Sequence, residues 1–320
     1  MFSTVRARER AALAQSAEHL TRNEKVKGSI PLGGSIRVFH RRVEHPHREK
    51  RQTMAPGPLA YFTKHEEGLY RATEHAESAW GDAGLHFSPV AGLLVHHLER
   101  WRARHADPTK QVGRISFDIL GHIANEDIRI ETRLVRPGRT IELLETTAII
   151  EDRPAISARS WVLSTVDTGR VAGGQAEPFP APEGLPARNI SSIWPGGYIR
   201  SLDARQVGDA RPGRASAWFS TDCDLVAGEE ASSLASYLAL VDTANGVAAR
   251  QRPEEWLFPN LDLTVHLFRQ PEGRWVGVDT TAIFGPTGQG LTSTILHDVH
   301  GQVGTAQQLL TLRPAPVRAD

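Results

Sequence analysis

Four runs rich in β-branched and apolar residues fill the stretch between residues 256 and 313, and turns rich in Gly and Pro separate them. Short turns of this kind join neighbouring antiparallel strands, so the stretch predicts a four-stranded meander. In its first run Leu261, Leu263 and Val265 alternate with polar residues, which makes one face of the strand apolar. Asp262 lies on the other face, where a carboxylate that contacts solvent is the simplest interpretation. Any fold of this chain must cover the apolar face of that sheet.

A long helix is predicted ahead of a second set of strand-like runs. Ser88 and Pro89 suit the N-cap and the first position of a helix, because the N–H group that proline lacks is unpaired there. Leu94, Leu98 and Trp101 continue the helical spacing, and the helix is expected to end near residue 105. Four strand-like runs follow it, at 112–120, 128–135, 140–150 and 155–166.

The second half of the chain repeats this order. Runs at 198–204 and 215–223 predict strands, and the spacing of Leu234 and Leu238 predicts a helix from residue 229 to about 250. The meander then follows. Short matches support a duplication: Gly138-Arg139 leads into Thr146-Thr147-Ala148-Ile149, Gly273-Arg274 leads into Thr280-Thr281-Ala282-Ile283, and Phe117-Asp118-Ile119 resembles Leu261-Asp262-Leu263. We therefore expect an α+β tandem, or double, hotdog fold, in which each half is a long helix wrapped by an antiparallel sheet.

Four segments are expected along the chain. Residues 1–53 hold 12 Lys/Arg against 5 Asp/Glu with weak periodicity, which predicts a disordered arm or an extension ahead of a true start at Met54. Residues 54–167 and 196–320 are the two predicted hotdogs. Residues 168–195 are rich in Gly and Pro and are expected to form an irregular linker.

Composition excludes several classes of function. The formal net charge is zero, but residues 54–320 hold 25 Lys/Arg against 32 Asp/Glu, and such an acidic body argues against nucleic acid as the main ligand. The sequence has no apolar run long enough to span a bilayer and no signal core near its start, so we expect a cytoplasmic protein without membrane association. Cys223 is the only cysteine, which excludes an internal disulfide and a thiolate metal cluster.

Other reactive groups have simple structural interpretations. His297 and His300 are three residues apart in a predicted strand, so their side chains point to opposite faces and a metal site is not expected. Cys223 is expected to be a small buried residue. Neither a Gly-x-Ser-x-Gly elbow nor a Gly-rich phosphate loop is present. We therefore expect neither a metal nor a cofactor.

The order of motifs resembles the acyl-CoA thioesterase II, or TesB-like, family over nearly everything from about Tyr61 to Pro314. The resemblance is carried by Arg114-Ile115-Ser116-Phe117-Asp118, Arg136-Pro137-Gly138-Arg139, Leu261-Asp262, Asp279-Thr280-Thr281 and Ala306-Gln307. It implies the double hotdog fold, acyl-CoA as the substrate, and association of chains into a dimer or a higher homo-oligomer.

The resemblance also implies a reaction and a site. The family hydrolyses acyl-CoA thioesters to free acid and CoA with a water molecule that Asp, Thr and Gln of the second half hold. By this resemblance the Asp falls on Asp262, the Thr on Thr281 and the Gln on Gln307. Thr280 and Gln308 stay open as alternatives, because a shift of one residue reverses the face of a strand.

These residue types suit thioester hydrolysis. A carboxylate can take a proton from water as a general base, while a hydroxyl and an amide can orient that water. Backbone N–H groups in the first turn of the second-half helix, near residues 231–233, are the expected donors to the oxyanion.

The sequence also departs from its relatives. Leu263 stands where they often carry His, and Phe87-Ser88-Pro89 stands where many carry a His-Gly-Gly segment. Two alternative functions on the same fold are a non-catalytic protein that binds acyl-CoA or acyl-carrier protein, and a hydratase, although the histidine motif of a hydratase is not visible.

Overall fold

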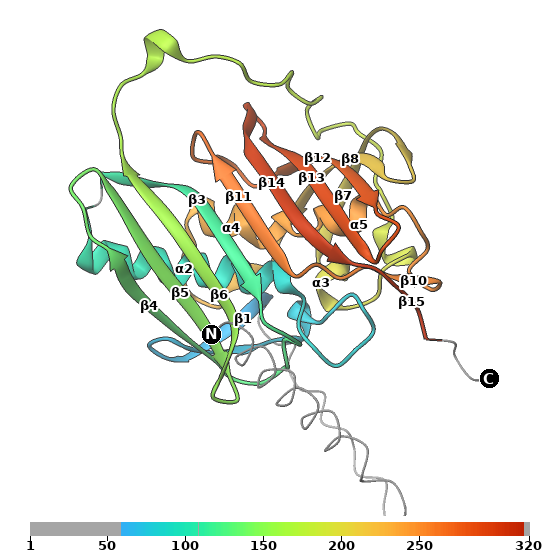
Figure 1. Cartoon of the computed structure of the whole chain (residues 1–320), viewed down its shortest axis with the longest axis horizontal. Helices are drawn as coiled ribbons and strands as arrows, with labels where there is room; N and C mark the ends of the chain where they lie inside the picture. The colour runs from blue at the N-terminus through green and yellow to red at the C-terminus, as the bar shows by residue number, and fades with distance from the viewer. Residues whose placement is uncertain (1–58, 108, 317–320) are drawn as a thin grey trace, which may run out of the picture. The chain divides into compact units, whose positions relative to one another are not determined.

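A computed structural model describes residues 59–107 and 109–316 of the chain (Figure 1). The expectations for residues 1–53 lie outside the described residues. The four strands predicted between residues 112 and 166 are all present. The first half contains β1 (Ala60–Glu66), β2 (Leu69–Ala72), the 3-10 helix η1 (Glu74–Ala76), α2 (Phe87–His105), β3 (Lys110–Ile119), β4 (Ile128–Arg136), β5 (Ile141–Ile150) and β6 (Arg153–Ser164).

The linker and the second half follow. In Figure 1 the linker leaves the end of β6 and passes along one end of the strands to the second half. Its elements and those of the second half are η2 (Gly169–Val171), η3 (Ile190–Ser192), α3 (Gly197–Arg200), β7 (Leu202–Arg211), β8 (Arg214–Thr221), β9 (Asp224–Val226), α4 (Ser233–Val241), α5 (Ala244–Val247), β10 (Trp256–Leu257), β11 (Asp262–Leu267), β12 (Val276–Phe284), β13 (Gln289–Asp298), β14 (Gly301–Thr311) and β15 (Arg313–Pro314).

Thirteen strands join the two halves into one sheet, in the order β7-β8-β12-β13-β14-β11-β3-β6-β5-β4-β2-β1-β9. The tandem hotdog fold is confirmed, but the prediction of a simple meander is wrong at β11. This strand pairs with β14 and β3 rather than with β12, which follows it in sequence. Leu263 and Val265 of β11 are fully buried, so the strand covers the core at the junction between the halves.

The junction has an approximate two-fold symmetry. Ser116 of β3 lies opposite Thr264 of β11, and their hydroxyl oxygens are 3.0 Å apart. In the first half Thr132 of β4 faces Thr146 of β5, and in the second half Thr280 of β12 faces Thr294 of β13; each pair of hydroxyl oxygens is 3.0 Å apart. The two halves are therefore structurally equivalent strand by strand, β3 to β6 matching β11 to β14.

This equivalence corrects the sequence repeat. The segment that begins at Thr146 lies on β5, which matches β13, whereas the similar segment that begins at Thr280 lies on β12, which matches β4. The two halves are copies of one unit, but the four-residue matches stand on non-equivalent strands. The buried strands of this sheet are all rich in β-branched and small residues, because such residues pack well on a half-buried sheet. Short sequence matches can therefore occur between strands that are not structurally equivalent.

The two long helices pack against each other beneath the sheet, and Figure 1 shows both behind the strands. A Cβ atom at Gly92 of α2 would lie 2.5 Å from the Cβ of Ala239 of α4, so only glycine allows this approach. Ala235 and Ala239 are the residues of α4 that lie at this contact. No helix of the described residues has the length and apolarity needed to cross a membrane.

Three local predictions need correction. The N-cap of α2 is His86 rather than Ser88, because its Nδ1 accepts a hydrogen bond from the backbone N–H of Ser88 at 3.1 Å. Residues 198–204 do not form one strand, since α3 occupies their first part before β7 begins. The second helix is shorter than expected and ends at Val241, where Asp242 caps it.

Candidate functional site

The structure places the three sequence-predicted site residues on the outer face of the sheet. Thr281 of β12 pairs with Ser293 of β13, which pairs with Gln307 of β14, so a whole strand separates Thr281 from Gln307. The hydroxyl of Thr281 accepts a hydrogen bond from Arg214, and Gln307 is exposed. Thr281 and Gln307 are therefore not brought together.

Asp262 also has a structural partner. Its Oδ1 accepts a hydrogen bond from the backbone N–H of Leu309 at 2.6 Å, and its residue partner across the junction is Asp118. Partial burial, together with the neighbouring charge of Asp118, raises the pKa of Asp262, while the Leu309 N–H lowers it. This carboxylate thus helps to hold β11 against β14 and lies on the face away from the helices.

The neighbouring residue Gln308 points the other way. It is 1% exposed, and its Nε2 donates a hydrogen bond of 2.7 Å to Oδ1 of Asp242. Alternation along a strand sends Gln307 and Gln308 to opposite faces, so the alternative that the sequence left open is the one that reaches the interior.

Asp242 is the centre of a buried polar cluster. It caps the C-terminus of α4, is 5% exposed, and its Oδ1 accepts a second hydrogen bond from Nδ2 of Asn260 at 2.8 Å. Thr292 of β13 donates to Oε1 of Gln308 at 2.7 Å, which turns the amide nitrogen of Gln308 toward the carboxylate. Two amides therefore hold Oδ1, while Oδ2 makes no hydrogen bond to another described residue.

Burial gives Asp242 an unusual affinity for protons. Removal from water raises its pKa from 3.8 to about 7, and the hydrogen bonds from Asn260 and Gln308 oppose part of that rise. His86 Nδ1 lies 3.8 Å from Oδ2, but burial lowers the pKa of this histidine to about 3. Because the same Nδ1 accepts the N–H of Ser88, His86 is a neutral imidazole here and the contact is not an ion pair.

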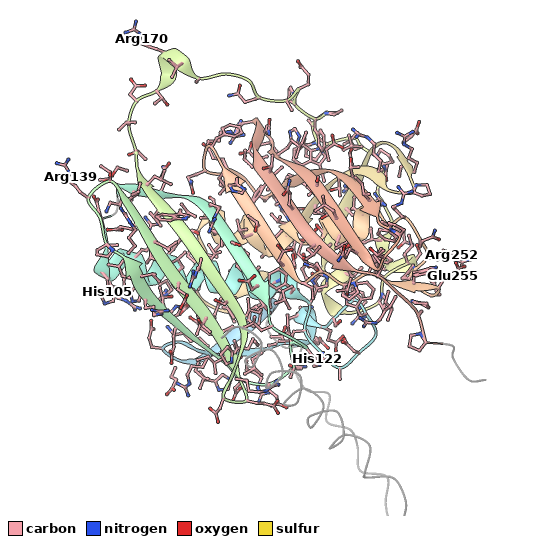
Figure 2. All side chains as sticks on the ribbon, in the orientation of Figure 1. His105, His122, Arg139, Arg170, Arg252 and Glu255 are labelled. Carbon is pink, nitrogen blue, oxygen red and sulfur yellow. The ribbon has the colours of Figure 1, made fainter. Side chains whose placement is uncertain are left out.

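Asp242 lies where two cavities meet. Both are also lined by Trp80, His86 and Asn260. The larger, of about 560 Å³, includes His122 and Arg313, and Figure 2 labels His122 in a loop beyond the strand ends. The other is smaller and is lined by aromatic and aliphatic side chains together with a few polar groups. A ligand could therefore pass the carboxylate with one part in each cavity.

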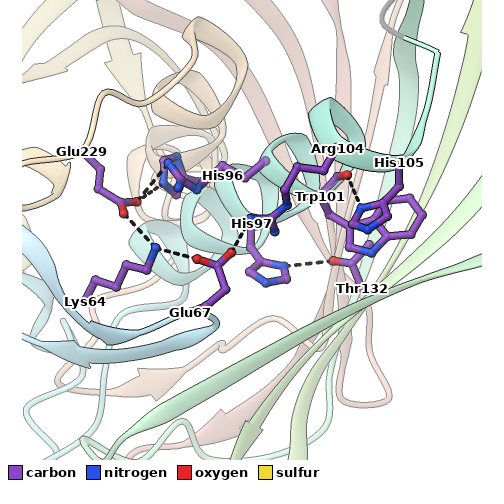
Figure 3. Close-up of polar contacts among 10 residues, drawn as sticks. Lys64, Glu67, His96, His97, Trp101, Arg104, His105, Thr132 and Glu229 are labelled. Atoms are coloured by element: carbon purple, nitrogen blue, oxygen red, sulfur yellow. Dashed lines mark hydrogen bonds and ion pairs between the residues drawn. The ribbon is translucent and has the colours of Figure 1, made fainter.

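The first half does not repeat this cluster. Thr292 pairs with Gln308 across β13 and β14, and Leu144 pairs with Ser160 across the equivalent strands β5 and β6. Ser160 and Leu144 therefore stand where the second half has Gln308 and Thr292. Polar groups near α2 instead form a different arrangement, in which Glu229 contacts His96 and Lys64, and His97 contacts Thr132 (Figure 3). The buried carboxylate with its two amide donors is therefore a feature of the second half alone among the described residues.

The sequence contained a signal for Asp242 that periodicity alone did not select. Asp242 comes four residues after Leu238 and eight after Leu234, so it continues the apolar stripe of the helix. A carboxylate at such a position is costly to bury unless other groups bind it. Its partners come from distant strands, and only folding brings them to it.

Comparisons with known proteins agree on the family. A model of the acyl-CoA thioesterase N-terminal domain matches residues 76–163, and a model of the C-terminal domain of the same enzymes matches residues 174–312. No curated protein sequence matches the chain significantly.

Solved structures share the fold at low identity. An acyl-CoA thioesterase II from Mycobacterium marinum is 18% identical, with a TM-score of 0.56 over 82% of this chain and 98% of that chain. A TesB protein from Mycobacterium avium subspecies paratuberculosis is 15% identical, with a TM-score of 0.58 over 79% and 96%. A conserved hot dog protein of unknown function from Alicyclobacillus acidocaldarius is 14% identical, with a TM-score of 0.62 over 81% and 97%.

Proposed function

We propose that this protein, which belongs to the acyl-CoA thioesterase family and is a thioester hydrolase, activates its attacking water with the carboxylate of Asp242. One observation carries the proposal: a buried carboxylate with a pKa of about 7 lines the junction of two cavities. A general base works best when its pKa lies near the operating pH, because it is then both ionised and basic enough to take a proton.

The neighbouring side chains leave one oxygen of Asp242 for the reaction. The amides of Asn260 and Gln308 both donate to Oδ1, so Oδ2 is the oxygen available to a water molecule. Thr292 fixes the orientation of the Gln308 amide. His86 borders the same oxygen as a neutral ring and adds no charge that would lower the pKa of the base.

The reaction follows from this arrangement. Oδ2 takes a proton from water while the water oxygen forms a bond to the thioester carbonyl carbon, and the carbonyl oxygen becomes an oxyanion. The C–S bond then breaks, and the sulfur leaves with the electron pair and takes the proton back from Asp242. The products are a free acid and the CoA thiol, and the carboxylate is regenerated without a covalent intermediate.

The oxyanion donors are proposed to come from α2. The sequence favoured the first turn of α4, but Asp242 caps the other end of that helix, and nine residues span about 13 Å. The N-terminus of α2 borders the site instead, because its N-cap is His86. Ser88 donates its backbone N–H to His86 and Pro89 has none, so the first turn offers the N–H of Phe87 as the donor. The positive end of the helix dipole also favours a developing negative charge there.

The test compares two matched substitutions. Asp242→Asn keeps the shape of the side chain but removes the base, and we expect kcat for acyl-CoA hydrolysis to fall roughly 100-fold to 10,000-fold. Asp262→Asn makes the same chemical change on the outer face, and we expect a rate near that of the wild type. CoA release measured with a thiol reagent gives both rates. Full activity of Asp242→Asn, or loss of activity only in Asp262→Asn, would contradict the proposal.

The same assay separates catalysis from simple binding. If the wild type binds acyl-CoA in a calorimeter but releases no CoA from acyl chains of different lengths, the protein acts as a binding hotdog. The paired amides and the elevated pKa of Asp242 favour catalysis, because a binding site has no need for a carboxylate poised to accept a proton.

Association of two chains through the outer face of the sheet is part of the proposal. Ile283, Leu291 and Leu309 lie in register on β12, β13 and β14, and they are 59%, 39% and 45% exposed. A row of apolar side chains on one face favours contact with a second copy. Light scattering of wild type and Leu309→Glu tests this, and an unchanged mass in the variant argues against this surface.

A further inference from the structure

The end of the linker forms a wall of the smaller cavity beside Asp242. Arg188, Ile190 and Trp194 all line it, although the sequence suggested only an irregular connection here. The backbone N–H of Arg188 donates to the carbonyl of Ala204 at 2.8 Å, which fastens this part of the linker to β7. This part of the linker is therefore held in place against the second half, and it does more than connect the two halves.

The guanidinium of Arg188 is only partly satisfied. Its Nη2 donates to the carbonyl of Val247 at 2.9 Å, whereas its Nη1 is buried and has no hydrogen-bond partner among the described residues. Burial lowers the pKa of Arg188, and no ion pair links it to a carboxylate in the part of the chain that the structure describes. A buried N–H group of a half-buried guanidinium is costly unless an acceptor, best an anionic one, meets it.

The rest of this cavity is mostly apolar. Trp80 and Trp194 meet edge to face with their ring centres 5.1 Å apart, and Ile190 and Ile193 lie beside them. Such walls suit the methylene groups of an acyl chain. Among the residues that line the cavity, Arg188 is the one cation that an anionic group could contact. The catalytic carboxylate of Asp242 borders the same cavity, so a chain that enters it starts at the reacting carbonyl.

We propose that the smaller cavity binds the acyl group of a CoA thioester that ends in a carboxylate, with the guanidinium of Arg188 as the ligand of that carboxylate. The inference rests on the proposed function, because it takes Asp242 as the place of the thioester. Arginine binds a carboxylate through paired charge-assisted hydrogen bonds. Its Nη1, which has no partner among the described residues, supplies the donor. Because the walls are mostly apolar, we expect a neutral polar chain to bind less well.

A phosphate of CoA is the other anion that could reach an arginine. The open cleft with His122 and Arg313 offers more room for the nucleotide, which favours the acyl carboxylate as the partner of Arg188. The two sources differ in a test, since every acyl-CoA carries the same phosphates and only some carry a terminal carboxylate.

The experiment pairs substrates of equal carbon number. Rates of CoA release are measured with hexanoyl-CoA and adipoyl-CoA, and with octanoyl-CoA and suberoyl-CoA, for wild type, Arg188→Met and Arg170→Met. Arg188→Met keeps an unbranched, flexible side chain but removes the guanidinium and its charge. Arg170 is exposed in η2 of the same linker, as Figure 2 shows, and provides the matched control.

We expect the wild type to favour the carboxylate-terminated substrates. Arg188→Met should lower their kcat/KM by roughly tenfold to a hundredfold and leave the methyl-terminated substrates nearly unchanged or improved. Arg170→Met should behave as the wild type. An equal loss on all four substrates would assign Arg188 to the CoA phosphates and overturn the inference, as would a wild type that hydrolyses only methyl-terminated chains.

Binding separates this inference from the proposed function. Calorimetric titration of adipoyl-CoA and hexanoyl-CoA is made with Asp242→Asn, alone and combined with Arg188→Met. Suppose that the wild type hydrolyses none of the substrates, but that adipoyl-CoA binds more tightly than hexanoyl-CoA and loses this advantage with Arg188→Met. The inference then stands and the catalytic proposal fails. Equal binding of both thioesters overturns the inference even where hydrolysis is observed.

Discussion

The replacement of Asp242 by Asn is expected to stabilise the fold at alkaline pH. The folded protein holds the proton of Asp242 up to a pH of about 7, whereas the unfolded chain releases it near 3.8. Between these values the folded state binds more protons, so the stability of the wild type falls as the pH rises. A change in pKa from 3.8 to about 7 corresponds to a cost on the order of 4 kcal/mol above pH 7.

Asn cannot ionise and escapes this cost. Its Oδ1 can still accept from Asn260 and Gln308, since both of their hydrogen bonds end on that oxygen in the wild type. The free energy of unfolding of Asp242→Asn relative to wild type should therefore grow by about 4 kcal/mol between pH 4 and pH 8. His86, whose pKa is lowered to about 3, adds its own pH dependence to both proteins, so it cancels in the difference.

Urea denaturation at several pH values, followed by circular dichroism, measures this difference. Asp209→Asn, at an exposed position of β7, controls for the loss of one negative charge and should show no comparable trend. A difference between wild type and Asp242→Asn that stays constant from pH 4 to pH 8 would show that the carboxylate titrates normally. The argument for Asp242 as the base would then lose its main support.

Three further outcomes are expected. The kcat/KM of the wild type should rise with pH and level off above about 7, because Asp242 acts in its ionised form, and a pH–rate profile without an inflection between 6 and 8 would contradict this role. Gln308→Leu should lower activity roughly tenfold or more by removing a donor to the base, while Gln307→Leu on the outer face should not, and equal activities of the two variants in the CoA-release assay would refute the assignment. Gly92→Ala should destabilise the protein by about 1–3 kcal/mol in urea denaturation, since its new Cβ would meet that of Ala239 at 2.5 Å, and wild-type stability would mean that the helices move apart freely.

The two glutamines of β14 show how a shift of one residue along a strand moves a candidate side chain to the other face of the sheet. The motif around Gln307 lies on β14, the strand that also carries Gln308, and these two neighbours occupy opposite faces of the sheet. The sequence left the choice between Gln307 and Gln308 open, because a glutamine can lie on either face. What distinguishes Gln308 is its hydrogen bond to Asp242, which lies at the end of a helix about 66 residues earlier in the chain. The period of residues along one strand cannot predict a contact with so distant a residue.

The sequence by itself determined most of the elements and their order, the presence of two similar halves, and the family. These follow from local properties: the period of apolar residues, the turn residues between runs, and short motifs in a fixed order. Only the tertiary structure decided that β11 joins the two halves, that Asp242 rather than Asp262 is surrounded by donors, and that the linker supplies Arg188 to a cavity. Those outcomes depend on contacts between residues far apart in the chain, and on burial, which changes the pKa of a carboxylate only after the fold has removed it from water.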